Sequence, residues 1–139
     1  MPGIHGFGSK LRRGGTAGTA VANVTSIRGP GLRVDTADVS AHDSPSAFEE
    51  AVAGIIRSGE VTLDINFEPD DVTHDETSGG LASDLKARTS QSWAIEYPTS
   101  PASFITFTAF VTGLEPAAPF DDKISATVTL KPTGVVTVV

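Results

Sequence analysis

The sequence contains no cysteine, and only one methionine, one tryptophan and one tyrosine among its 139 residues. The absence of cysteine excludes disulfides, thiolate nucleophiles and sulfur-ligated zinc. No stretch approaches the roughly 18 consecutive apolar residues that a membrane-spanning helix needs. The N-terminus also lacks the apolar run of a secretory signal. We therefore expect a globular protein without a membrane association, made in a cytoplasm and long enough to bury a core without covalent staples.

Motifs for catalysis and ligand binding are also missing. The glycine-rich segment GFGSKLRRGG at residues 6–15 does not follow the phosphate-binding pattern G-x-x-x-x-G-K-[ST]. No G-x-S-x-G nucleophile elbow is present. His42-Asp43 and the acidic run 70–76, which contains His74, do not have the spacing of a zinc or calcium site. The sequence therefore predicts no catalytic, metal-binding or cofactor-binding residue, and a protein that is not an enzyme.

Charge is divided unevenly along the chain, whose net charge is −7. Residues 1–34 contain five basic residues and no acidic one, whereas residues 35–139 contain the other five basic residues and all 17 acidic ones. Residues 1–19 are also rich in glycine, which predicts a flexible basic arm preceding a single β domain at 20–139. Such an arm is either a solvated tail or a contact that settles on the acidic face of another copy.

Alternating apolar and polar residues predict most of the secondary structure. The alternation covers residues 61–67, 91–97, 103–114 and 124–131, and it is typical of strands with one buried face. Turn signals such as Gly29-Pro30-Gly31 separate these strands from shorter ones. Strands joined by turns favour antiparallel sheets, so the predicted fold class is mainly β, an antiparallel sandwich or barrel.

Two helices are predicted beside these strands. Apolar residues at helical spacing, followed by Gly59 as a stop, predict one flanking helix at about 46–57; they are Phe48, Val52, Ile55 and Ile56. Ser46 and Glu49 fit a capping box at its start. A shorter apolar pattern predicts a possible second helix at about 81–88.

Three segments, taken in order, resemble the major tail tube proteins of long-tailed, siphovirus-type bacteriophages. They are VTSIRGPGLRVDTADVSAHDSP at 24–45, AVAGIIRSGEVTLDINFEP at 51–69 and SFITFTAFVTGLEPAAPFDDKISATVTLKPTG at 103–134. The resemblance extends over most of the chain, from about Val21 to Val136. It implies a β-sandwich or barrel with a helix packed on its side.

The resemblance also implies a function and partners. It implies a structural virion protein of the tail, six copies of which form a ring whose inner wall is a shared β-barrel. The rings stack into a tube around the tape-measure protein, meet tail-tip and terminator proteins at the tube ends, and later carry DNA without binding it specifically. No cofactor is implied.

Two sets of residues are candidates for contacts between copies. The first is the N-terminal arm, expected to order between stacked rings: Ile4, Phe7, Lys10, Leu11, Arg12 and Arg13. The second is the wet side of the clearest strand, expected at the lumen or at a subunit contact: Glu60, Asp64 and Glu68.

Two other classes of protein fit part of the pattern. A lectin-like β-sandwich would use Trp93 and Tyr97 as a stacking platform, although their spacing is also that of core residues. A tail terminator, a secretion-tube ring protein or a capsid decoration protein would share the fold without always polymerising.

Overall fold

The computed structural model describes residues 3–43 and 45–138. Residues 1–2 of the predicted arm and residue 139 of the predicted domain, together with residue 44, lie outside the described residues. The strands are β1 Lys10–Arg13, β2 Thr19–Ala20, β3 Val24–Arg28, β4 Leu32–Asp38, β5 Ala51–Ser58, β6 Val61–Asn66, β7 Gln91–Tyr97, β8 Ser103–Ala117 and β9 Ser125–Val138. One α-helix, α1 Leu81–Ala87, and one 3-10 turn, η1 Pro45–Ala47, complete the described elements. The predicted fold class, mainly β with antiparallel sheets and one helix, is confirmed.

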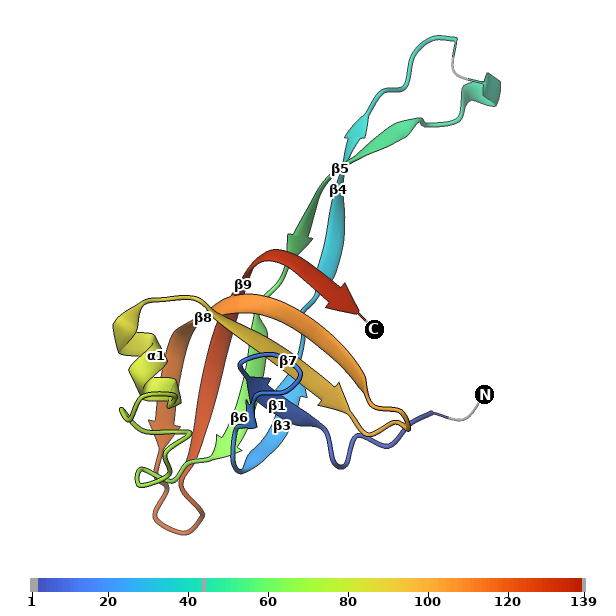
Figure 1. Ribbon diagram of the computed structural model, residues 1–139. Helices are drawn as coiled ribbons and strands as arrows, with labels where there is room; N and C mark the ends of the chain where they lie inside the picture. The colour runs from blue at the N-terminus through green and yellow to red at the C-terminus, as the bar shows by residue number, and fades with distance from the viewer. Residues whose placement is uncertain (1–2, 44, 139) are drawn as a thin grey trace.

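The body of the molecule is a single curled sheet (Figure 1). Its seven strands follow the order β2-β1-β7-β8-β9-β6-β3, and every paired neighbour is antiparallel. The two remaining strands, β4 and β5, form a separate hairpin that projects away from the body. A curled sheet can enclose a core on its concave side, and this sheet does so.

The core lies inside the curl and follows the predicted alternation. In β6, Val61, Leu63 and Ile65 are buried while the residues between them are partly exposed. The same alternation holds in β9, where Ala126, Val128 and Leu130 are buried. The other fully buried large side chains include Leu11, Leu81, Trp93 and Ile95. The core therefore joins residues from both ends of the chain.

The short predicted helix is confirmed as α1, which packs against β8. Leu81 is buried in the common core, and Leu85 packs against that core. The helix ends at Arg88, which takes a left-handed conformation with φ 57° and donates its backbone N–H to the Asp84 carbonyl oxygen.

The predicted helix at about 46–57 is wrong. Residues 51–58 form strand β5, paired with β4, and only residues 45–47 form a helical turn. Val52, Ile55 and Ile56 are β-branched side chains, which lose rotamer freedom in helices and fit a pleated strand. Gly54, opposite Asp35 in the hairpin, disfavours a helix interior as well. A strand partner was available in β4, and pairing with it displaced the helix.

The predicted arm is partly built into the body. Lys10–Arg13 form β1, which pairs with β7, and Thr19–Ala20 form β2, which pairs with β1. Among the described residues, the segment that precedes the sheet is therefore 3–9 rather than the whole of the predicted arm.

Candidate assembly surfaces

The β4–β5 hairpin carries an unusual amount of exposed apolar surface. Its large apolar side chains are between 45% and 74% exposed; they are Leu32, Val34, Val39, Phe48, Val52, Ile55 and Ile56. Isolated two-stranded hairpins are only marginally stable in water. A hairpin with this composition is therefore a candidate surface for contact with another polypeptide.

The two faces of the hairpin differ in character. Val34 lies opposite Ile56, and cross-strand partners share a face, so one face is apolar near the body. Arg33 lies opposite Arg57 on the other face. The Arg57 guanidinium donates to Asp35 at 2.5 Å, and this hydrogen bond raises the pKa of Arg57. Near the body, the hairpin thus offers one apolar and one charged face.

Three of the predicted arm residues are accessible. Ile4 is 69% and Phe7 86% exposed, and Lys10 is exposed on β1. Ile4, Phe7 and Lys10 border an open groove of about 820 Å³, whose lining also includes Ile27 and Tyr97. This part of the chain therefore exposes both apolar and basic side chains.

The other three predicted arm residues are held within their own chain. Leu11 is fully buried in the core, so it offers no side-chain surface to a second copy. Arg12 forms an ion pair with Glu96 at 3.4 Å. Arg13 donates to both Asp84 oxygens, from Nε at 2.7 Å and from Nη2 at 2.8 Å, and this bidentate contact raises the pKa of Arg13. Because Asp84 is buried on α1, this ion pair joins β1 to the helix.

The predicted lumen residues lie along β6 and at its two ends. Asp64 is in the middle of the strand, on the face away from the core, and accepts a hydrogen bond from the Thr127 hydroxyl at 3.2 Å. Glu60 and Glu68 are exposed, one before the strand and one after it. The surrounding outer face is built largely from small polar side chains, since Thr62 pairs with Thr129 and Asn66 with Ser125. The three carboxylates thus follow one polar face from end to end.

His74 is a structural residue that the sequence placed in a solvated loop. It is fully buried and stacks on Phe67 with ring centroids 5.9 Å apart. Its Nε2 lies 2.7 Å from the Ala22 carbonyl oxygen, and its Nδ1 accepts from the Glu68 N–H at 3.2 Å. Both ring nitrogens are therefore engaged with the backbone, which ties the 67–80 loop to the chain ahead of β3.

The stacking platform of the lectin-like alternative is not formed. Trp93 is fully buried and donates its indole N–H to the Ala109 carbonyl oxygen at 3.3 Å. A ring in the core cannot stack on a sugar. Within 3–43 and 45–138, no group of three or more His, Asp or Glu side chains could hold a metal ion. Over the same residues, no helix is long and apolar enough to cross a membrane.

Solved structures with this fold come from tails and injection systems. The tail of an empty gene transfer agent particle, refined with C6 symmetry, matches with a TM-score of 0.76 and 14% identity over 99% of both chains. A sheath/tube terminator of an extracellular contractile injection system matches at 0.74, with 14% identity over 99% of this chain and 97% of the other. The SPP1 tail tube matches at 0.65, with 9% identity over 95% and 77%. The chain therefore shares its fold with components of phage tails and of injection systems.

The amino-acid sequence shows the family to which the chain belongs. The family model described as "Lambda phage tail tube protein, TTP" matches residues 15–138, so the chain belongs to the lambda phage tail tube protein family. No curated protein sequence matches it. The chain is a structural subunit of the tail tube, and its place is the tail of the virion.

Proposed function

We propose that six copies of the chain close into a ring and that these rings stack into the tail tube. The tube surrounds the tape-measure protein during assembly, ends in tail-tip and terminator proteins, and later conducts DNA. The subunit acts by assembly and catalyses no reaction. The similar gene transfer agent tail has C6 symmetry, and a similar anti-feeding prophage baseplate has six-fold symmetry, which support a six-copy ring.

The observation that carries this proposal is the exposed apolar surface of the β4–β5 hairpin. The hairpin projects from the body, so its outer residues Val39, Phe48 and Val52 can reach a neighbouring copy (Figure 1). Burial of such side chains against another copy stabilises both the contact and the hairpin itself. In a closed ring every hairpin contacts the same surface of the next subunit. Such a contact is heterologous, and it forms a ring when the rotation from one subunit to the next closes on itself.

The outer face of β6 and β9 is the surface that we assign to the lumen. Threonine, serine and asparagine side chains make most of it polar and uncharged, and the cation Lys131 lies at its hairpin end. Asp64 adds a negative charge near its middle, with Glu60 and Glu68 at the ends of β6. A wall that repels phosphates lets DNA slide, whereas a basic wall would hold it. Asp64→Lys is therefore expected to slow DNA release from assembled particles, and release at the wild-type rate would contradict this assignment.

The exposed part of the N-terminal segment is assigned to the contact between rings. Ile4 and Phe7 provide apolar surface and Lys10 a positive charge, while Arg12 and Arg13 support this segment through their ion pairs with Glu96 and Asp84. Phe7→Ser is expected to weaken stacking without changing the stability of the subunit, because Phe7 is 86% exposed.

Removal of the hairpin tests the ring most directly. Thr36 pairs with Ala53, so residues 37–52 can be replaced by Asn-Gly, a two-residue turn suited to a hairpin. Analytical ultracentrifugation should show rings for the wild-type chain and monomers for the shortened one. The shortened chain should keep the circular dichroism spectrum of a folded β protein, because the core lies in the seven-stranded sheet and not in the hairpin. Rings of the shortened chain would refute the proposed role of the hairpin.

A further inference from the structure

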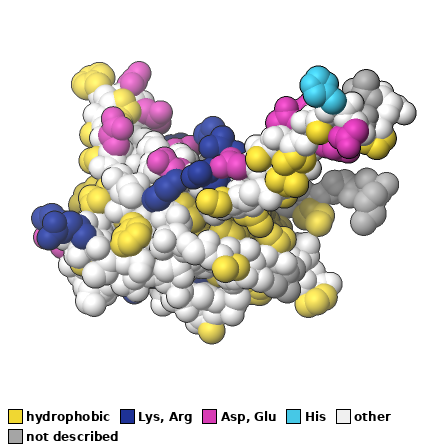
Figure 2. Space-filling model, turned by 90° about the horizontal axis from the view of Figure 1, so that it is seen from above, with side chains coloured by type: hydrophobic (Ala, Val, Ile, Leu, Met, Phe, Trp, Pro, Cys, Tyr) yellow, Lys and Arg dark blue, Asp and Glu magenta, His cyan; other side chains and the backbone are white. Residues whose placement is uncertain are grey.

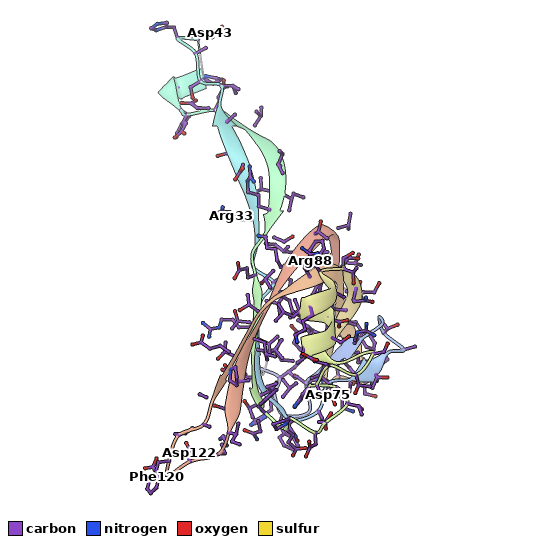
Figure 3. All side chains as sticks on the ribbon, turned by 90° about the vertical axis from the view of Figure 1, so that its left-hand side faces the viewer. Arg33, Asp43, Asp75, Arg88, Phe120 and Asp122 are labelled. Atoms are coloured by element: carbon purple, nitrogen blue, oxygen red, sulfur yellow. The ribbon has the colours of Figure 1, made fainter. Side chains whose placement is uncertain are left out.

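The turn between β8 and β9 presents an isolated aromatic side chain to solvent. This turn, residues 118–124, lies at the end of the molecule opposite the hairpin (Figure 3). Phe120 is fully exposed, with a relative exposure of 105%. Asp121 and Asp122 follow it directly, and Asp122 Oδ1 accepts from the Lys123 N–H at 2.8 Å. The turn thus combines a projecting apolar side chain with two carboxylates.

A groove of complementary composition lies at the other end, where the hairpin leaves the body. This root groove has a volume of about 800 Å³ and lies between the base of the hairpin and the 131–134 segment of β9. Its lining includes the apolar side chains Leu32, Ile55 and Ile56. It also includes three cations, Arg33, Arg57 and Lys131, against one carboxylate, Glu60, which leaves a net charge of +2.

Two of the cations in the root groove have no acidic partner of their own. Arg57 is paired with Asp35, but within the described part of the chain no carboxylate lies within 4 Å of the Arg33 or Lys131 nitrogens. The Lys131 ammonium donates to the Ser58 carbonyl oxygen at 3.4 Å. In Figure 2, which looks down on the hairpin end, basic side chains gather beside hydrophobic ones. An acidic, apolar ligand is the kind that such a groove accepts.

We propose that the Phe120 turn of one copy docks in the root groove of a copy in the adjacent ring. This proposal rests on the proposed function, since it assumes stacked rings. Phe120 enters the groove against Leu32 and Ile55, and Asp121 and Asp122 face Arg33 and Lys131. The segment from Glu115 to Ile124 contains three carboxylates and one lysine, a net charge of −2 that matches the +2 of the groove.

The placement of the two surfaces explains why their contact leads to stacking. Phe120 and Arg33 are far apart along the long axis in Figure 3, so one chain cannot join its own turn to its own groove. A contact between opposite ends of identical subunits leaves a free groove and a free turn on the complex. Each added ring therefore presents the same pair of surfaces as the ring before it, and the contact repeats along the tube.

Substitution of Phe120 separates stacking from ring closure. Phe120→Ser is expected to leave the circular dichroism spectrum and ring formation unchanged, because the Phe120 side chain is fully exposed in its own subunit. The concentration needed for tubes should rise by about tenfold or more. Val72→Ser, which changes another exposed apolar residue, is the matched control. Tubes of Phe120→Ser at the wild-type concentration would overturn the proposal, whereas a wild-type chain that forms no rings would overturn the proposed function instead.

Charge reversal tests the partner surfaces. Asp121→Lys alone and Arg33→Glu alone are each expected to stop stacking at the ring stage, since each brings like charges together. The double variant Asp121→Lys/Arg33→Glu should restore tubes. If the double variant stacks no better than either single one, the two residues do not face each other.

Cross-linking provides a measurement that does not depend on loss of assembly. The natural chain has no cysteine, so Phe120→Cys with Leu32→Cys introduces a single possible pairing between turn and groove. Oxidation of tubes should yield covalent chains of more than two subunits in a denaturing gel. The pair Phe120→Cys with Val72→Cys should yield dimers at most. Equal products from both pairs would contradict docking in the root groove.

Discussion

Two substitutions in the outer hairpin, Phe48→Ser and Val52→Thr, should separate assembly from folding. Phe48 is 74% exposed and Val52 51% exposed, and the hairpin belongs to a different sheet from the core. Surface substitutions of this kind usually change the free energy of unfolding by less than about 0.5 kcal/mol. The isolated subunit should therefore unfold at the same urea concentration as the wild type.

The effect on assembly follows from the surface that these side chains still expose. Complete burial of a large apolar side chain stabilises a contact by about 1.5–3 kcal/mol. Because Phe48 has about three quarters of its surface left to bury, and Val52 about half, their loss should weaken each contact between copies by ~2 kcal/mol. That loss corresponds to an increase of about 30-fold in the dissociation constant.

Sedimentation over a concentration series measures this change in the dissociation constant. The control is Val72→Thr, because Val72 is an apolar residue that is 62% exposed and lies outside the hairpin. Assembly of the double variant at the wild-type concentration would refute the reasoning. A large fall in unfolding free energy would also refute it, since the hairpin would then be part of the core.

Three further predictions concern the subunit itself. Leu11→Ala should lower the free energy of unfolding by about 2–5 kcal/mol in urea denaturation, because Leu11 is fully buried, whereas Ile4→Ala should change it little; equal effects would contradict the placement of β1. Asp84→Ala should lower the free energy of unfolding by ~2–3 kcal/mol, less than the loss of a fully buried ion pair, because Arg13 is partly exposed. The double variant Arg13→Leu/Asp84→Leu should recover part of this loss. An unchanged free energy of unfolding in Asp84→Ala would refute this prediction. Hydrogen bonds from the Thr73 hydroxyl at 2.6 Å and the Thr73 N–H at 2.8 Å lower the pKa of Asp71 below its ordinary value of 3.8. Its contribution to stability is thus complete above the ordinary value and lost as pH falls through the lower one. The melting temperatures of the wild type and Asp71→Asn should therefore approach each other as the pH falls below 3.8, and a constant difference would contradict this.

Much of the body could be predicted because local pattern and tertiary burial agree there. In β6 and β9 the apolar residues at every second position are those that enter the core. The same holds for α1, whose Leu81 and Leu85 face the core as their spacing indicates. In such elements the apolar residues face the core and the polar residues face away from it, so the spacing of apolar residues in the sequence predicts the buried face.

The hairpin could not be predicted in this way. Phe48, Val52, Ile55 and Ile56 have helical spacing, but no core of their own chain selects that spacing. These side chains are exposed in the subunit, and in the proposed ring they are buried by another copy, so the rule that apolar periodicity marks an internal face does not apply. The β-branched content of residues 52–56 and Gly54 were the local signals that favoured a strand.

Two other parts depend on partners distant in sequence. The KLRR segment has a charged, glycine-flanked composition typical of a mobile tail, yet β7 supplies a strand partner and Asp84 a counter-ion from more than 70 residues away. His74 lies in a polar loop, and its burial follows from backbone groups at Ala22 and Glu68 that have no sequence signature.

We infer that this chain alone contains the surfaces that build a tube. Negative-stain electron microscopy of the purified protein, over a concentration and salt series, tests it most directly. We expect six-fold rings and hollow tubes. Stacking should be lost before the rings are, because salt screens the charges that join turn and groove. A monodisperse monomer at every concentration, even after addition of tail-tip components, would contradict it.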